Sequence, residues 1–246
     1  MEKDARLART AALELLVSQH EDRQPARLRT WKLAAMVVLL GALSASWVLR
    51  RPWFESNLAV VASGLVIRSA QPTTQLADWA RRYQLKSVVN LRGGGPGDWW
   101  YGNEIKSAKE SGIAYYDLPL SATRRPTRRE LLQLIDLLET CSYPLLIHCK
   151  SGADRTGLAS ALYRMVRRGE PPEAALSSFS IEFGHIPFFG TEHLHEPLQE
   201  YAAWLKSSGK THSADLFRTW VRNEYVAPDP PADPALIRPG PRTRRS

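Results

Sequence analysis

Short apolar runs alternate with amphipathic stretches between Arg50 and Val226, and this alternation restricts the fold more than any other feature of the sequence. Short apolar runs predict strands, and the amphipathic stretches between them predict helices. The predicted strands are residues 65–68, 87–91, 113–118 and 144–148, and the predicted helices are residues 74–83, 100–111, 127–140, 156–168, 172–180, 196–207 and 215–225. This order indicates an α/β fold with a mostly parallel central sheet flanked by helices.

Local signals mark where several of these helices begin and end. Thr127 and Glu130 have the spacing of a capping box, which places a helix start at Thr127. We expect Thr73 or Thr74 to cap the helix over residues 74–83, and Gly169 to end the helix over residues 156–168. Ligands in folds of this class bind beyond the carboxyl ends of the strands, so those ends are where we look for chemistry.

An uncharged run of 17 residues, 33–49, precedes these elements and has basic residues on both sides. Its length is at the short end of what spans a bilayer, so we predict one membrane anchor over residues 31–51. The alternatives are a buried core helix and a signal peptide cleaved near residues 44–46. Basic residues are more numerous before the run than after it, which favours a single-pass topology with a cytoplasmic N-terminus.

The anchor divides the chain into four predicted parts. They are a juxtamembrane segment (residues 1–30), the anchor (31–51), one domain (52–226) and a disordered tail rich in Pro and Arg (227–246). The formal net charge is +8, but residues 1–32 and the tail together carry half of it, so the charge does not predict a nucleic-acid partner. Two cysteines without a CxxC pair exclude a disulfide framework and a zinc finger.

The strand over residues 144–148 leads directly into a loop with a nucleophile. Residues 148–157 have the sequence His-Cys-Lys-Ser-Gly-Ala-Asp-Arg-Thr-Gly, and a helix is predicted to begin where the loop ends. The free N–H groups of such a loop and helix start bind an anion, and the same positive end favours the thiolate of Cys149. Arg155 can hold two oxygens of a phosphate, and Gly152 permits the tight backbone. These groups converge on one phosphorus atom.

The pattern His-Cys-x5-Arg-Thr-Gly resembles the signature of the cysteine-dependent protein tyrosine and dual-specificity phosphatases. Segments outside the loop also resemble the compact bacterial branch of that superfamily: residues 68–72 (Arg-Ser-Ala-Gln-Pro), 88–92 (Val-Val-Asn-Leu-Arg) and 118–120 (Leu-Pro-Leu). The resemblance covers roughly residues 60–204. It implies a dual-specificity phosphatase-like fold and the hydrolysis of phosphate monoesters.

The resemblance also implies roles for the loop residues. Cys149 attacks phosphorus to form a phosphocysteine, Arg155 binds the phosphoryl oxygens, the Thr156 hydroxyl stabilises the departing thiolate, and His148 supports the loop. The rest of the loop is expected to bind the substrate: Lys150, Ser151, Gly152 and Ala153. No metal or other cofactor is implied.

The position of the general acid departs from the family pattern. The resemblance implies an aspartate in the loop after the strand over residues 113–118, but that loop, residues 121–125, contains no carboxylate. Asp117 has the usual spacing, 32 residues before Cys149, but falls within a predicted strand. Asp154 resembles the loop aspartate of a bacterial and lipid-directed subgroup, and we favour it over Asp117. Asp98 is a more distant candidate.

Arginines also gather before and at the start of the helix over residues 127–140. Arg124 and Arg125 are candidates to bind further phosphates of the substrate, with a solvated basic helix end as the alternative. Three histidines later in the chain, which lack a companion metal-binding motif, are expected to be surface or loop residues: His185, His193 and His195.

The sequence therefore predicts a membrane-anchored phosphatase whose substrate is a phosphorylated protein or a phosphoinositide-like phospholipid. A rhodanese-like sulfurtransferase, which also uses a loop cysteine at a strand end, is one alternative. A pseudophosphatase that binds phosphorylated ligands is the other, although such proteins usually lack the cysteine or the arginine, and Cys149 and Arg155 are both present.

Overall fold

The computed structural model of the chain describes residues 23–54, 56–188 and 190–227, together with Arg6, Thr10, Leu13 and Glu14. The chain divides into two compact units, Met1–Val48 and Leu49–Ser246. Most of the predicted juxtamembrane segment and nearly all of the predicted tail lie outside the described residues.

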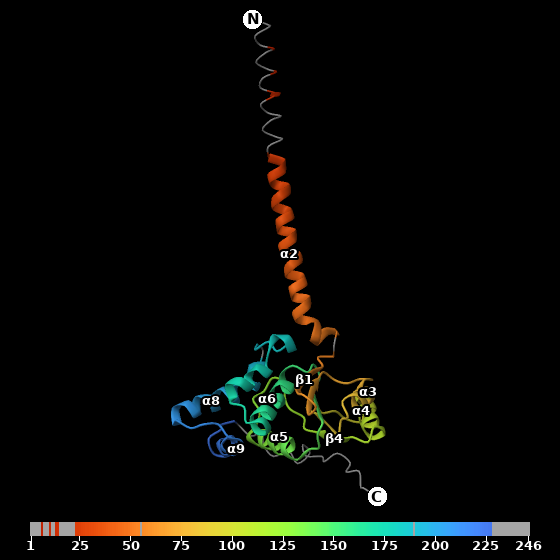
Figure 1. Ribbon diagram of the computed structural model, residues 1–246, viewed down its shortest axis with the longest axis vertical. Coiled ribbons are helices and arrows are strands. Elements are labelled where there is room, and N and C mark those ends of the chain that lie inside the picture. Colours follow the sequence, from red (N-terminus) through yellow and green to blue (C-terminus); the bar gives the residue numbers. More distant parts are fainter. Residues whose placement is uncertain are drawn as a thin grey trace. The chain divides into compact units, whose positions relative to one another are not determined.

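Five short strands form one sheet in the order β1-β2-β5-β3-β4. Figure 1 labels two of them, β1 and β4. They are β1 (Ala59–Ala62), β2 (Val66–Ser69), β3 (Ser87–Asn90), β4 (Ala114–Asp117) and β5 (Leu145–His148). The last four are mutually parallel, which confirms the predicted α/β fold with a mostly parallel sheet. The strand β1 is not predicted from the sequence and pairs with β2 in the antiparallel direction.

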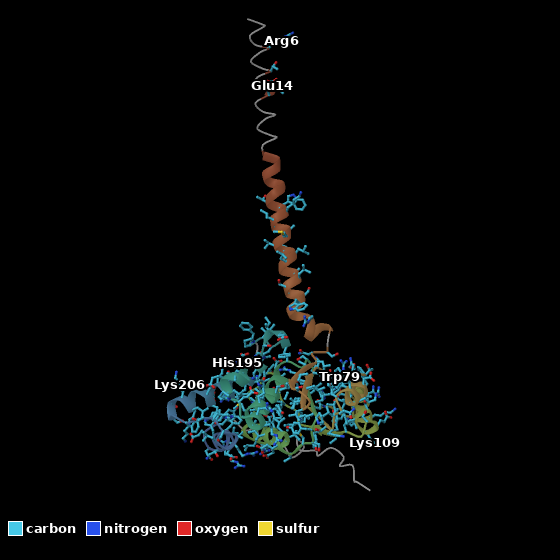
Figure 2. The ribbon with its side chains drawn as sticks, viewed as in Figure 1. Arg6, Glu14, Trp79, Lys109, His195 and Lys206 are labelled. Carbon is cyan, nitrogen blue, oxygen red and sulfur yellow. The ribbon has the colours of Figure 1, made fainter. Side chains whose placement is uncertain are left out.

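Two helices lie on one face of the sheet, α3 (Leu76–Arg82) and α4 (Trp99–Glu110). The other face is covered mainly by α5 (Arg128–Thr140), α6 (Asp154–Arg168), α8 (Glu196–Ser208) and α9 (Ala214–Asn223). In Figure 2, Trp79 and Lys109 lie on the side of α3 and α4, and His195 and Lys206 lie on the opposite side. Short helical turns connect α6 to α8: α7 (Pro172–Ala175), η1 (Leu176–Ser178), η2 (Ile181–Phe183) and η3 (Thr191–Leu194).

Successive side chains of a strand point to opposite faces of the sheet, so each strand contributes to the core on both faces. In β5, Leu146 packs with α3 and α4, whereas Leu145 and Ile147 pack on the α5 and α6 side. Because the strands are in register, Asn90 and Asp117 lie level with His148 at the carboxyl edge, on the α4 face. Cys149, the next residue, belongs to the core of the other face.

The predicted helix signals are confirmed in part. Thr127 and Glu130 form a capping box, and Gly169 ends α6 in a left-handed conformation. The predicted cap of the helix over residues 74–83 is wrong, because α3 begins at Leu76 with Gln75 as N-cap and no side-chain cap. The Thr73 hydroxyl donates instead to the Gln75 side chain at 3.2 Å.

The apolar run belongs to one helix, α2 (Arg23–Phe54). Its segment Thr30–Trp47 is long enough and apolar enough to cross a membrane, and none of that segment is buried. A signal sequence and a core helix of a soluble protein meet the same criteria of length and composition. The helix extends beyond the predicted limits of 31–51 at both ends.

Candidate active site

The loop after β5 is held open by residues outside it. The backbone carbonyls of Lys150, Ser151, Gly152 and Ala153 each accept a hydrogen bond from beyond the loop. The donors are the Gln71 N–H (3.2 Å), the Asn57 side-chain amide (2.9 Å) and the Arg68 guanidinium, which reaches both Gly152 (2.8 Å) and Ala153 (3.1 Å). With four successive carbonyls bound on the outside, the amide N–H groups are left for the inside of the loop, as in an anion-binding nest.

Cys149 lies within this loop and is 1% exposed. The Gly152 N–H donates to its Sγ at 3.3 Å, which is the contact expected for a sulfur enclosed by loop amides. The helix α6 begins at Asp154 with Thr156 in its first turn, two residues earlier than predicted. Thr156 is fully buried, and its hydroxyl has no hydrogen-bond partner among the residues described.

Arg155 reaches from α6 towards the ends of the neighbouring strands. Its Nη1 donates to the carbonyl of Leu120 at 3.2 Å and, more weakly, to that of Leu91 at 3.5 Å. Its buried Nε has no partner within the described part of the chain. The guanidinium is therefore anchored through one nitrogen and keeps donors for a bound oxyanion.

Gly152 is the residue that this loop geometry requires. Its φ is +72°, and an added Cβ would lie 2.6 Å from the backbone atoms of Ser69 and Ala70. The loop thus packs against the end of β2 more closely than any other residue type allows.

We expect Gly152→Ala to lower kcat at least about 100-fold and to destabilise the domain by roughly 1–3 kcal/mol, because the Cβ pushes the loop off β2. Gly95→Ala is the matched control, since a Cβ at Gly95 meets nothing within 4 Å. Phosphate release and urea unfolding of the two variants measure both effects. Equal, small effects in both would show that the close approach at Gly152 is unimportant.

Arg68 and Asn57, which hold the loop from outside, were not predicted as site residues. Arg68 is 2% exposed at the end of β2 and also donates to the Ser178 carbonyl at 2.8 Å, while its guanidinium covers the Phe183 ring. Asn57 is fully buried. Arg68 belongs to a segment that carries the family resemblance, but Asn57 has no signal in the sequence, because its partners are 94 and 126 residues away.

The model of one protein family, described as DSP-PTPase phosphatase fused to NAD+ kinase, matches residues 53–187, which is more than half of the chain. The chain belongs to this phosphatase family. The resemblance inferred from the loop motif is confirmed. The matched range contains the whole sheet and the loop from Cys149 to Arg155.

Curated relatives of this phosphatase domain are matched over part of their length. The dual specificity protein phosphatase TpbA of Pseudomonas aeruginosa is 32% identical over 116 residues, which are 46% of this chain and 49% of TpbA. The inositol diphosphatase DSP4 of Arabidopsis thaliana is 32% identical over 119 residues, 46% of this chain and 57% of DSP4. The chain thus spans about half the length of the curated relatives it matches.

Among solved structures, TpbA of P. aeruginosa in complex with phosphotyrosine is 24% identical, with a TM-score of 0.49. The match covers 69% of this chain and 92% of that structure.

Asp117, one candidate acid of this family member, is the last residue of β4, as predicted. Its carboxylate accepts hydrogen bonds from Asn90 (2.8 Å) and from the Tyr101 hydroxyl. Burial is the main cause that raises the pKa of Asp117 above its ordinary value of 3.8, and these two hydrogen bonds lower it. Below the loop, His148 Nε2 lies 2.6 Å from Glu104 Oε1, and both side chains are fully buried. Asp117 thus belongs to a buried polar layer under the loop.

We expect Asp117→Asn to become more stable relative to the wild type as pH rises. A carboxyl whose pKa is raised in the folded state favours folding below its ordinary pKa, and this contribution is lost as pH rises through the raised value. Asparagine does not ionise, so the variant avoids that loss. Urea unfolding between about pH 4 and pH 8 measures the difference. A difference that is independent of pH would contradict this account.

Asp154, the other candidate acid, contacts a histidine that the sequence analysis assigned to the surface or to loops. His185 Nδ1 lies 2.8 Å from Asp154 Oδ1, and His185 Nε2 lies 3.2 Å from His195 Nδ1. His185 lies in a loop, which is one of the two placements expected for it, and it is only 6% exposed. Burial and the neighbouring His185 lower the pKa of His195. The three side chains form a continuous chain that ends at the active-site loop.

Arg125 forms an ion pair with Glu200. Its guanidinium binds both carboxylate oxygens of Glu200 on α8, lies 3.6 Å from Glu196 and covers the Tyr225 ring. Arg124 pairs with Glu130 at 2.7 Å. These ion pairs within the protein argue against the binding of substrate phosphates by Arg124 and Arg125, and they also differ from the alternative of a solvated basic helix end.

Proposed function

We propose that the chain is a cysteine-dependent phosphatase that hydrolyses phosphate monoesters through a phosphocysteine. The proposal rests on the geometry of the active-site loop. Four of its carbonyls are bonded from outside, which leaves amide donors around the Sγ of Cys149. Arg155 follows in the first turn of α6. A phosphate seated there meets a nucleophile, a nest of N–H groups and a guanidinium. The family match leaves the sulfurtransferase alternative without support, and both Cys149 and Arg155 are present in the loop, unlike in most pseudophosphatases.

The reaction has two displacements at phosphorus. The Cys149 thiolate forms the S–P bond while the P–O bond to the leaving group breaks, and a protonated aspartate gives its proton to the leaving oxygen. Water then attacks phosphorus, the aspartate takes a proton from that water, and the S–P bond breaks to return the thiolate. Arg155 and the loop amides hold the phosphoryl oxygens in both steps, and the Thr156 hydroxyl stabilises the departing thiolate.

We propose Asp154 as the aspartate that moves this proton. The alternation of β4 and β5 supports it, because Asp117 lies on the α4 face with His148, whereas Cys149 belongs to the opposite face. Asp154 instead lies directly beside Arg155 at the start of α6. His185 Nδ1 lies 2.8 Å from Asp154 Oδ1, so Oδ2 is the oxygen that we propose to carry the proton.

We further propose the four-part organisation of the chain, with α2 as a single membrane anchor and residues 52–226 as the phosphatase domain. The length and composition of Thr30–Trp47 support the anchor. TpbA is named a protein phosphatase and DSP4 an inositol diphosphatase. These names support two proposed substrate classes for this chain, a phosphorylated protein and a phosphorylated inositol such as the headgroup of a phosphoinositide-like lipid. Release of phosphate from p-nitrophenyl phosphate, compared with the Cys149→Ser variant, tests the proposed chemistry.

A further inference from the structure

An exposed apolar edge lies beside the active site and takes no part in the proposed chemistry. We call it the apolar rim and define it as Ile181, Ile186, Pro187 and Phe188. Ile181 is 60% exposed, Ile186 51% and Phe188 64%. The rim borders an open groove of about 480 Å³ whose floor includes Phe179, His185 and His195. Large apolar side chains gathered on an exposed edge indicate a binding surface.

One buried side chain joins the rim to the active-site loop. The Asn57 amide donates to the carbonyl of Phe183, within the rim segment, at 2.8 Å and to the carbonyl of Ser151, within the loop, at 2.9 Å. His185 lies between two rim residues in sequence and contacts Asp154. The rim and the loop are therefore fixed relative to each other through two separate contacts.

The same asparagine is where the chain enters the phosphatase domain. Phe54 is the last residue of α2, and Asn57 follows three positions later. Three residues extend over at most about 11 Å. The candidate span ends at Trp47, and the seven further residues of α2 add about 10 Å. With α2 held in a bilayer, Asn57 therefore stays within roughly 20 Å of the membrane surface.

We propose that the apolar rim inserts into the interfacial layer of the bilayer that α2 spans. This inference rests on the proposed membrane anchor. The bilayer is the occupant that the short link to α2 favours, because the link keeps the domain near the membrane and Asn57, which the link reaches, is bonded to the rim segment through Phe183. The charged residue of the rim segment, residues 181–188, is Glu182, which is exposed and acidic. Insertion therefore depends on the apolar side chains rather than on attraction to anionic lipids, and it is insensitive to salt.

The consequence is a restriction on which substrates are reached. Because Asn57 binds both Phe183 and Ser151, docking of the rim holds the active-site loop close to the membrane surface. We therefore expect phosphate monoesters carried at that surface to be favoured over soluble ones.

Fluorescence quenching in the full-length chain tests the rim. In a Cys149→Ser, Cys141→Ala background, a bimane label is placed on Phe188→Cys or Ile186→Cys, and the protein is reconstituted in phosphatidylcholine vesicles with or without spin-labelled phosphatidylcholine. The matched control is Val226→Cys, an apolar residue outside the rim that is 78% exposed. Leu39→Cys reports on the anchor itself.

We expect quenching of at least about twofold at positions 39, 186 and 188, little at position 226, and no change in 0.5 M salt. If the label at position 39 is quenched but the label at position 188 is quenched no more than the label at position 226, insertion of the rim is overturned and the membrane anchor is still supported. A blue-shifted but unquenched label at position 188 would show that a protein surface covers the rim, and this too would overturn the proposal.

Absence of quenching at position 39 would remove the anchor and the rim together. Phosphatase chemistry is measured separately, on p-nitrophenyl phosphate with Cys149 in place. Its outcome is therefore independent of all three results.

Discussion

Replacing Cys149 with serine is expected to reduce phosphate release from p-nitrophenyl phosphate by at least about 10⁴-fold. A serine hydroxyl stays protonated near neutral pH, and the loop offers it no base at the position of Sγ. The substitution changes one buried atom, and the Gly152 N–H that donates to Sγ at 3.3 Å can donate to the hydroxyl instead. The loop therefore keeps its shape while the nucleophile is lost.

The second cysteine gives the matched control for this experiment. Cys141 is also buried, at 6% exposure, but it lies at the end of α5 rather than in the loop. Burial raises its pKa, so it is a poor nucleophile. Cys141→Ser should keep turnover within about twofold of the wild type and lose some stability because a polar group enters the core. Phosphate release that persists in Cys149→Ser would exclude the phosphocysteine, and loss of release in both variants would point to a folding defect.

The parts of the fold that the sequence predicts are those with short-range signals. The buried face of α5 follows from apolar residues at helical spacing, and all four predicted positions are fully buried: Leu131, Leu134, Ile135 and Leu138. The active-site loop is predicted for a similar reason, because nucleophile, glycine and arginine occupy one continuous segment of ten residues.

The contacts that shape the site were not predicted because they join distant parts of the chain. Arg68 is 84 residues from Gly152, and His185 is 31 residues from Asp154. A histidine in an irregular loop has no periodicity that distinguishes a buried hydrogen-bonded side chain from an exposed one. The ion pair of Arg125 escapes sequence analysis for the same reason, since its partner Glu200 lies 75 residues away on another helix.

The local error at α3 has a different cause. Threonine is a favourable N-cap, and two threonines precede the helix. Gln75 competes for both of them, because its side-chain oxygen accepts from the Thr73 hydroxyl and from the Thr74 N–H. The Thr73 hydroxyl is thus bound to Gln75 instead of capping the helix, and α3 begins at Leu76, later than predicted.

Replacing Asp154 with asparagine is expected to lower kcat by roughly 10²–10³-fold and to remove the basic limb of the pH–rate profile. The acid must carry a proton when the leaving group departs, so the wild-type rate falls as rising pH removes that proton. Asparagine has no such proton to lose, and the remaining rate no longer falls on the basic side. The loss should be larger for phenyl phosphate than for p-nitrophenyl phosphate, because the phenyl leaving oxygen is more basic and needs the proton more.

Two further variants separate the candidates. Asp117→Asn should keep the basic limb, since its carboxyl lies on the opposite face of the sheet from Cys149 and is bound by Asn90 and Tyr101. His185→Asn should lower kcat less than Asp154→Asn, because the His185 ring contacts Oδ1 of Asp154 and does not itself carry the transferred proton. His193→Asn is the control. It changes a partly exposed histidine whose Nδ1 lies 3.0 Å from Glu196. If Asp117→Asn loses the limb and Asp154→Asn keeps it, the proton comes from the buried layer beneath the loop, and Asp154 with His185 serves to hold the start of α6.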